Sequence, residues 1–340
     1  MKIDTQMRDL DLMSVAAEAA RAERVGFDAI WAFEAAHNPF LPLVLAAQAT
    51  SRVELGTNIS VAFARSPFSM AQVAWDLQKA SRGRFHLGLG TQVRAHVERR
   101  FSMPFDQPAA RIVDYIRCVR AIWDSFQNGT RPDYQGRFYQ FRLINPAFNP
   151  GRIDWPDIPI YLAGVNPRMC RAAGEVADGF HVHPMHSTSY VREVVLPEIA
   201  AGAAAGGRPD RRLALYASVF AICGESQSER AESERRAREQ VAFYASTPNY
   251  RALLEHHGFD GLGKELSDLM RRGEFAAMPG QVPDELLEAV TVSARFDELG
   301  AMLRRRYQGL IDRVSLYFPM PEGAEEAPWR AFVEAFRAAV

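Results

Sequence analysis

Apolar and polar positions alternate along the chain in two recurring patterns. Short runs of apolar residues, typical of buried strands, are followed by longer stretches with apolar residues at helical spacing. The predicted strands are 2–4, 27–33, 53–61, 84–90, 158–162, 179–183, 213–222 and 313–318. The predicted helices are 11–25, 40–50, 67–80, 108–126, 167–176, 189–205, 226–245, 284–306 and 328–339.

Eight strands alternating with helices predict a parallel sheet closed into an α/β fold, the (β/α)8 TIM barrel. We expect one domain spanning residues 1–340. Two segments interrupt the rhythm, at about 128–157 and 247–282, and the run YQGRFYQF in the first predicts a hairpin. Long insertions in a compact domain are usually lids or binding loops. We therefore expect both to lie at the carboxyl-terminal rim and to cover a site there.

Composition narrows the class of protein. Forty basic and forty-one acidic residues give a net charge of -1, which argues against a nucleic-acid partner and a polybasic membrane anchor. No apolar run approaches membrane-spanning length, and we see no signal peptide at the amino terminus. The three cysteines are far apart and form no Cys-x-x-Cys pair. These features predict a cytoplasmic protein with a small-molecule substrate.

The ends of the predicted strands are the places to look for chemistry, because active sites of such barrels lie at the carboxyl ends of the strands. Strand 27–33 is followed by Glu34 and, three residues later, His37, a pair suited to acid–base work. Other strand ends carry polar residues or glycines, which respectively hydrogen-bond a ligand and allow its close approach. These are Thr57, Asn58 and Ile59; Gly90, Thr91 and Gln92; and Ala163, Gly164 and Val165.

The histidines suggest one alternative interpretation, a barrel that binds a metal ion. His181 and His183 alternate on one strand, so both rings point to the same side, as in barrels that bind a metal. The sequence has no H-E-x-x-H and no cluster of carboxylates, and we predict no metal site. The adjacent pair His256 and His257 falls in the second insertion, where we expect it to be solvated.

Several runs resemble one protein family. The runs are GFDAIWAFE, LGTNISVAFARSPFSMAQVAWDLQKASRGRFHLGLG, IPIYLAGV and EVADGF. They resemble the luciferase-like monooxygenase superfamily over essentially the whole chain. FSMPFDQPAAR and EAAHNPF are similar to a branch whose oxidoreductases use the deazaflavin coenzyme F420.

The resemblance implies a coenzyme ring in the barrel mouth. It implies a cis peptide between Asn58 and Ile59 beside that ring. The residues at the ends of strands three, four and five would then line the ring and its tail. Arg65 and Arg94 are candidates for the coenzyme's phosphate or acidic tail. The reaction implied is hydride transfer between F420 and a small organic substrate.

The sequence departs from this branch at one position. Related enzymes place a histidine directly after the acidic residue, where this chain has Ala35. The candidate catalytic residues are therefore Glu34, His37 and His183. Two alternatives stay open, a monooxygenase that uses FMN and dioxygen, and a barrel that binds the coenzyme without catalysis.

The resemblance also implies a homodimer or a larger homo-oligomer. The helix predicted at 67–80 carries more large apolar residues than one buried face requires. They are Phe68, Met70, Val73, Trp75 and Leu77.

Overall fold

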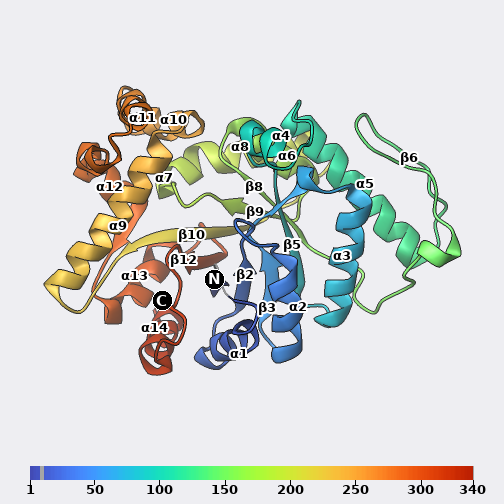
Figure 1. Ribbon diagram of the computed structural model, residues 1–340, viewed down its shortest axis with the longest axis horizontal. Helices are drawn as coiled ribbons and strands as arrows, with labels where there is room; N and C mark the ends of the chain where they lie inside the picture. Colours follow the sequence, from blue (N-terminus) through green and yellow to red (C-terminus); the bar gives the residue numbers. More distant parts are fainter. Residues whose placement is uncertain (8–10, 340) are drawn as a thin grey trace.

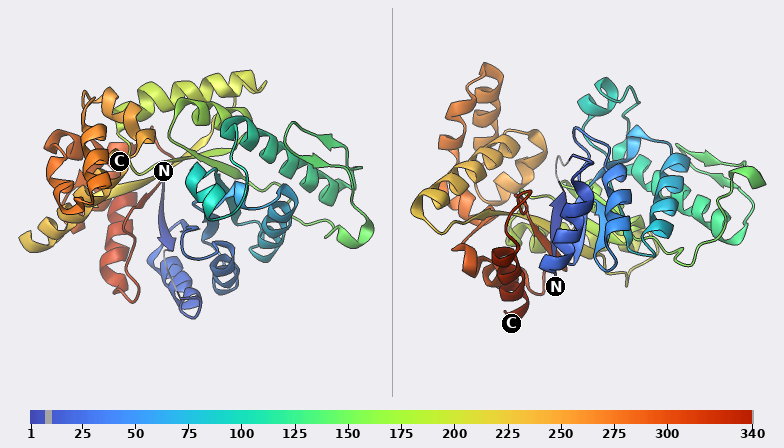
Figure 2. Two further views of the ribbon diagram at one scale, coloured as in Figure 1. Left: turned by 45° about the horizontal axis from the view of Figure 1, so that its top comes forward. Right: turned by 60° about the horizontal axis from the view of Figure 1, so that its bottom comes forward.

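The computed structural model describes residues 1–7 and 11–339. Eight parallel strands close into a barrel surrounded by helices (Figures 1 and 2). They are β1 (Lys2–Met7), β2 (Ala29–Ala32), β3 (Glu54–Thr57), β5 (Phe85–Gly90), β8 (Ile160–Gly164), β9 (Gly179–Val182), β10 (Ala214–Ile222) and β12 (Arg313–Leu316). Neighbours in this order pair in parallel, and β12 pairs with β1, which closes the ring. The (β/α)8 prediction is confirmed.

Helices form the outer layer. Those that follow the strands are α1 (Val15–Val25), α2 (Phe40–Ala49), α3 (Pro67–Ala80), α5 (Pro108–Asn128), α6 (Pro167–Val176), α8 (Leu196–Ala205), α9 (Gln227–Ala245), α13 (Phe296–Tyr307) and α14 (Glu326–Ala338). Shorter pieces are β4 (Ser60–Val61), a 3₁₀ turn (Ala62–Ala64), α4 (Arg94–Arg99), a 3₁₀ turn (Pro146–Phe148), α7 (Thr188–Tyr190) and a π-helical turn (Val191–Val195). No helix in the described part of the chain is long and apolar enough to span a membrane.

Local signals explain where these helices begin. Helix α3 starts at Pro67 as predicted, with the Ser66 hydroxyl accepting the Ser69 N–H at its amino end. Helix α1 starts at Val15, four residues later than predicted. Asp11 uses its carbonyl and carboxylate to accept the N–H groups of Ser14 and Met13, so this segment forms a turn instead.

The predicted helix at 284–306 is wrong as a continuous element. The structure divides it into α12 (Asp284–Val290), the strand β11 (Thr291–Ser293) and α13. Strand β11 pairs in parallel with the end of β10, at Phe220–Ile222. The β-branched Thr291 and Val292 favour this extended pairing, which helical periodicity on either side conceals.

The first insertion does not cover the barrel mouth. Its predicted hairpin forms, as β6 (Tyr134–Gln135) and β7 (Gln140–Phe141), but the segment follows a helix and precedes a strand. It lies along the outside of the barrel (Figure 1). The Asp114 carboxylate on α5 accepts hydrogen bonds from the Tyr134 hydroxyl and from two hairpin N–H groups. The hairpin thus supports helices, and the expectation that it forms a lid is wrong.

The second insertion lies at the opposite end of the molecule from the hairpin (Figures 1 and 2). It follows α9 and consists of short helical pieces. These are a 3₁₀ turn (Pro248–Tyr250), α10 (Arg251–His256), α11 (Leu262–Arg272) and two further 3₁₀ turns (Phe275–Ala277 and Pro279–Gln281). Its first residues contact the segment that follows β9, at the carboxyl-terminal rim.

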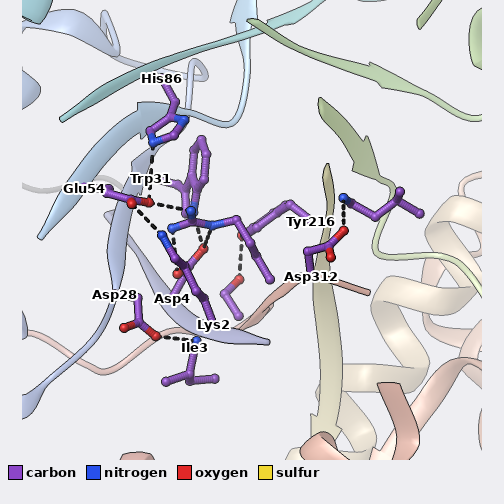
Figure 3. A network of polar contacts seen from close by, with 12 residues as sticks. Lys2, Ile3, Asp4, Asp28, Trp31, Glu54, His86, Tyr216 and Asp312 are labelled. Atoms are coloured by element: carbon purple, nitrogen blue, oxygen red, sulfur yellow. Dashed lines mark hydrogen bonds and ion pairs between the residues drawn. The ribbon is translucent and has the colours of Figure 1, made fainter. Parts of the chain in front are cut away.

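A buried ion-pair network closes the amino-terminal end of the barrel (Figure 3). Arg313 donates to both oxygens of Asp4, at 2.7 and 3.1 Å, and also to Glu54. Trp31 donates its indole N–H to Asp4 at 2.9 Å. Burial alone would raise the pKa of Glu54, but hydrogen bonding with His86 and the charge of Arg313 hold that pKa well below its usual range. The opposite end of the barrel is therefore the end that a ligand can reach.

Most of the large apolar residues of α3, which suggested an oligomer, are buried within the chain. Met70, Trp75 and Leu77 are at most 2% exposed. Phe68 packs against Phe126 of α5 and Phe141 of the hairpin. Phe68 is thus covered by α5 and the hairpin, so these residues of α3 do not call for a second copy.

Gly88 provides a test of barrel packing. A Cβ atom there would lie 1.7 Å from the Thr57 carbonyl oxygen and 2.6 Å from His181 Nε2. Gly88→Ala should therefore lower the free energy of unfolding by about 3 kcal/mol, since backbone must move to admit the methyl group. Denaturant unfolding measures this loss. Gly280→Ala, where a Cβ meets nothing within 4 Å, is the control, and equal losses in both variants would contradict the argument.

Candidate active site at the barrel rim

The carboxyl-terminal rim contains a break between β3 and β4. The Asn58–Ile59 peptide is cis, at the position that the family resemblance implied. The Asn58 N–H donates to the Ala32 carbonyl at 2.8 Å, which ties the break to the end of β2. Strand β4 then pairs with β5 through Ser60 and Leu89. The break turns the chain at the rim, with Asn58 and Ile59 both half-buried.

Glu34 stabilises this break. Its carboxylate is 5% exposed and accepts two hydrogen bonds from the Arg65 guanidinium, at 2.8 and 2.9 Å. The same carboxylate accepts the Val61 N–H at 2.6 Å, and the Glu34 N–H donates to the Ile59 carbonyl. Arg65 is thereby engaged inside the protein, so neither side chain is free for a ligand in this structure. Glu34 thus contacts the backbone on both sides of the break.

Thr57 also hydrogen-bonds to backbone groups. Its buried hydroxyl donates to the Gly88 carbonyl at 2.6 Å and accepts the Gly88 N–H at 2.9 Å. Gly90 lies two residues further along β5, at the carboxyl end of the strand, and a Cβ atom there would come within 2.8 Å of the Ile59 side chain. Thr91 and Gln92 follow, half-buried, with Gln92 in the left-handed backbone region at φ 57°.

The end of β8 completes a stretch of rim with little side-chain bulk. Ala163, Gly164 and Val165 are half-buried and lead into α6. Ala163 pairs with His181 and Gly164 with Val182 of the neighbouring strand. The structure thus brings Asn58, Ile59, Gly90 and residues 163–165 to one end of the barrel, as predicted.

His37 and Arg94 lie apart from this group. His37 is exposed in the loop between β2 and α2. Arg94 is exposed at the start of α4 and pairs with Glu98 at 2.7 Å. No contact of either residue singles it out as a ligand-binding group.

His183 is held in one orientation at the rim. The Met185 N–H donates to its Nδ1 at 3.0 Å, so Nδ1 carries no proton and the neutral ring is protonated at Nε2. Nε2 lies 2.8 Å from the Tyr250 hydroxyl, which comes from the second insertion. Burial, with a smaller effect from His186, lowers the pKa of His183 to about 3. His183 is therefore neutral near pH 7 and acts there as a hydrogen-bond donor.

His181 lies deeper, inside the barrel. Its ring packs edge-on against Trp31 and Tyr216, each with centroids 5.0 Å away. Burial lowers its pKa to about 3. The two alternating histidines therefore lie in different surroundings. Across the described ranges 1–7 and 11–339, no group of three or more His, Cys, Asp and Glu side chains is arranged to hold a metal ion.

The structure adds polar residues that the sequence did not single out. Gln6 on β1 donates to Ser218 at 2.6 Å and to Ser315 at 2.8 Å. Ser218 and Ser315 alternate with apolar residues on β10 and β12, and this pattern could have indicated in the sequence that both serines face the barrel interior. Tyr244 and Tyr317 share a 2.8 Å hydrogen bond beside His183, and no local pattern predicts that meeting.

A cavity of about 600 Å³ adjoins the β1 side of the rim. It is lined by residues of β1, β12, α9 and α14, among them Gln6, Leu316, Arg236 and Trp329. None of the predicted site residues lines it. The predicted site is thus a separate surface on the β3, β5 and β8 side.

Comparison with known proteins identifies what the chain is similar to. A family model described as luciferase-like monooxygenase matches residues 4–313. An uncharacterized protein of Mycobacterium tuberculosis is 44% identical over 323 residues, covering 95% of this chain and 94% of that protein. A putative coenzyme F420-dependent oxidoreductase of the same organism is 28% identical over 299 residues, covering 82% and 83%.

Solved structures share the fold. The coenzyme F420 dependent tetrahydromethanopterin reductase of Methanopyrus kandleri superposes with a TM-score of 0.78 at 22% identity, covering 98% of this chain and 97% of that one. The monooxygenase RslO1 of Streptomyces bottropensis superposes with a TM-score of 0.69 at 18% identity, covering 99% of each.

The pairing of Glu34 with Arg65 can be tested by contrast with Arg94. Arg65→Met leaves the buried Glu34 carboxylate without its partner and should lower the free energy of unfolding by about 3 kcal/mol. Arg94→Met removes an exposed pair and should cost less than about 1 kcal/mol. Denaturant titration of both variants gives the comparison. Equal effects would show that the Glu34–Arg65 pair does not stabilise the rim.

Proposed function

Because the chain belongs to the luciferase-like monooxygenase family, we propose that it is an oxidoreductase that transfers hydride between coenzyme F420 and a small organic substrate. The observation that carries the proposal is the shape of the rim. The break at Asn58–Ile59 lies beside strand ends where Gly90 and Ala163 offer only a hydrogen and a methyl side chain. The similarity to a putative F420-dependent oxidoreductase favours this coenzyme.

The chemistry of the rim residues fits a flat ring with a polar edge. Small residues leave the backbone of β5 and β8 open to a planar group, and the Asn58 amide offers both a donor and an acceptor. The residues proposed to bind the coenzyme are Thr57, Asn58, Ile59, Gly90, Thr91, Gln92, Ala163, Gly164 and Val165. F420, when bound, supplies the hydride chemistry, while the chain positions the reactants and excludes water.

Roles for the polar side chains follow from their contacts. Glu34 would act through the break, by keeping Asn58 and Ile59 in place. Neutral His183 would donate a hydrogen bond at the rim. Related enzymes have a histidine at the position of Ala35, and the exposed His37 is the candidate that would transfer a proton in its place. A flavin monooxygenase that uses FMN is the second candidate, favoured by the structural similarity to a monooxygenase.

Titration with F420 and with FMN, each followed by fluorescence, tests the coenzyme. We expect tight F420 binding and weak FMN binding. Ala163 pairs with His181, whose ring lies inside the barrel, so both side chains point to the same side of the sheet. Ala163→Leu should therefore weaken F420 binding at least roughly tenfold, because the larger side chain would fill part of the mouth. Ala201→Leu, on the exposed face of α8, is the matched control. Tight FMN binding would favour the monooxygenase, and binding of neither coenzyme would refute the proposal.

We further propose that the protein is cytoplasmic, because three free cysteines suit a reducing compartment. All three are free thiols, and Cys118 and Cys170 are buried. Burial raises the pKa of each of these two thiols to about 12, so they are inert packing groups.

We also propose a homodimer that uses α2. Leu41, Val44 and Leu45 lie on one side of this helix and are 56%, 42% and 37% exposed. Residues three and four apart share a helix face, so the three side chains form one apolar stripe.

Leu41→Glu should convert the dimer into a monomer, because the charge would be buried unpaired at the interface. Light scattering after size-exclusion chromatography reads the mass. Met302→Glu on α13, an isolated exposed apolar residue, should leave the dimer intact. A monomeric wild-type protein would refute the proposal.

A further inference from the structure

Tyr250, in the second insertion, brings its hydroxyl group to the tip of the His183 ring. The hydroxyl oxygen lies 2.8 Å from His183 Nε2. His181 points into the barrel, and His183 follows it by two positions, so the His183 ring points to the same side, at the mouth. Between them, Val182 pairs with Gly164 of the proposed coenzyme site. The Tyr250 hydroxyl therefore lies at the end of the strand next to that site.

The hydrogen of this hydroxyl is not used in the contact with His183. His183 Nδ1 accepts the Met185 N–H at 3.0 Å, so the neutral ring carries its hydrogen on Nε2. Nε2 therefore donates, and the Tyr250 oxygen accepts. Tyr250 forms no other hydrogen bond with residues 1–7 and 11–339. Its own O–H is thus a donor without an acceptor among these residues.

A second tyrosine–histidine pair nearby has the opposite direction. His186 Nδ1 lies 2.8 Å from the His183 carbonyl oxygen, so Nδ1 carries the hydrogen of the neutral ring. Burial lowers the pKa of His186 to about 4, which keeps this ring neutral near pH 7. Its Nε2 therefore accepts the hydrogen of the Tyr307 hydroxyl, at 3.1 Å. The two tyrosines make the same contact, but only Tyr307 uses its hydrogen in it.

The other phenol groups beside His183 also use their hydrogens. Tyr317 donates to the Gln240 side chain at 3.1 Å, so Tyr244 donates in the 2.8 Å contact that the two hydroxyls share. The Tyr244 ring packs edge-on against His183, with centroids 4.6 Å apart. Of the three hydroxyls grouped here, only that of Tyr250 has a hydrogen that meets no acceptor in the described part of the chain.

Burial makes the unused hydrogen of Tyr250 informative. Tyr250 is 7% exposed. Buried polar groups are nearly always hydrogen-bonded, so a buried donor that the protein leaves unbonded points to a partner from outside the chain. Burial also raises the pKa of Tyr250 above its ordinary value, and the hydroxyl keeps its hydrogen near pH 7.

The segment that carries Tyr250 is fixed to the rim by further contacts. His256 at the end of α10 and the next residue, His257, lie 3.1 and 2.8 Å from the hydroxyls of Ser189 and Ser187, which follow β9. Both histidines are half-buried, so the prediction that they are solvated is wrong. Tyr250 is therefore held on both sides, by His183 and by this pair.

We propose that the Tyr250 hydroxyl, oriented by His183, donates a hydrogen bond to the oxygen of a carbonyl substrate, or of the alcohol related to it. The choice of substrate class rests on the proposed function, because hydride transfer to a carbonyl carbon places negative charge on its oxygen. A donor already fixed beside that oxygen binds it more strongly as the charge develops. Tyr250 would thus supply a contact that Ala35 cannot make.

The tautomers on which the proposal depends can be observed directly. Nitrogen-15 NMR of the full, ligand-free protein with labelled histidine should show His183 protonated at Nε2 and His186 protonated at Nδ1. His183→Gln and His186→Gln assign the two signals. His183 protonated at Nδ1 would overturn the proposal, since the Tyr250 hydrogen would then be used by the ring.

Benzamide is a suitable probe of the donor, because its carbonyl oxygen accepts a hydrogen bond and resists reduction. Ligand-observed NMR titration of the full protein, with and without F420, measures its affinity. We expect saturable binding that Tyr250→Phe weakens roughly fivefold to tenfold, since one hydrogen bond is lost. Tyr307→Phe, the same change at a hydroxyl whose hydrogen is used, should bind benzamide as the wild type does.

Three results of the titration would overturn the proposal: no saturable binding by the wild type, equal affinity in the wild type and Tyr250→Phe, or equal losses in Tyr250→Phe and Tyr307→Phe. Benzamide binding that depends on Tyr250, in a protein that binds neither F420 nor FMN, would leave the donor standing and refute the coenzyme function. Tight F420 binding with benzamide affinity independent of Tyr250 would do the reverse.

Discussion

The interior of the barrel is the constraint on which the structure depends. Trp31 is fully buried there and packs against Tyr161, His181 and Tyr216. These rings fill the space so completely that the facing positions on β3 and β5 must be glycines. A Cβ atom at Gly56 would lie 2.3 Å from the Trp31 ring. Close packing of this kind holds the eight strands in one register.

The filled interior determines where function can reside. Below the aromatic layer, the buried Arg313 pairs with the buried Asp4 and with the half-buried Glu54, and this network closes the barrel (Figure 3). Buried charges are stable only when paired, and all three are. Above the layer, the strand ends carry glycine and alanine, and the chain turns at the cis peptide. The carboxyl-terminal rim is therefore the end of the barrel at which we propose that the ligand binds.

Polar residues at the rim mostly hold the backbone in place. Thr57 bridges β3 to β5, and the Glu34–Arg65 pair fastens the break between β3 and β4. Thr57 and Glu34 thus support the backbone of the rim on which the proposed coenzyme would lie.

The sequence alone determined the fold class, because the alternation of strand and helix patterns is a local property and a closed parallel barrel is its main solution. It also placed the strand ends, and so brought Asn58, Gly90 and Gly164 to one rim. The partners of Glu34 and of His183 could not be read in this way. Arg65 lies thirty-one positions from Glu34, and Tyr250 lies sixty-seven from His183, so only the packed structure brings each pair together. Strand β11 and the outward position of the hairpin were decided in the same way, by long-range pairing that outweighs local pattern.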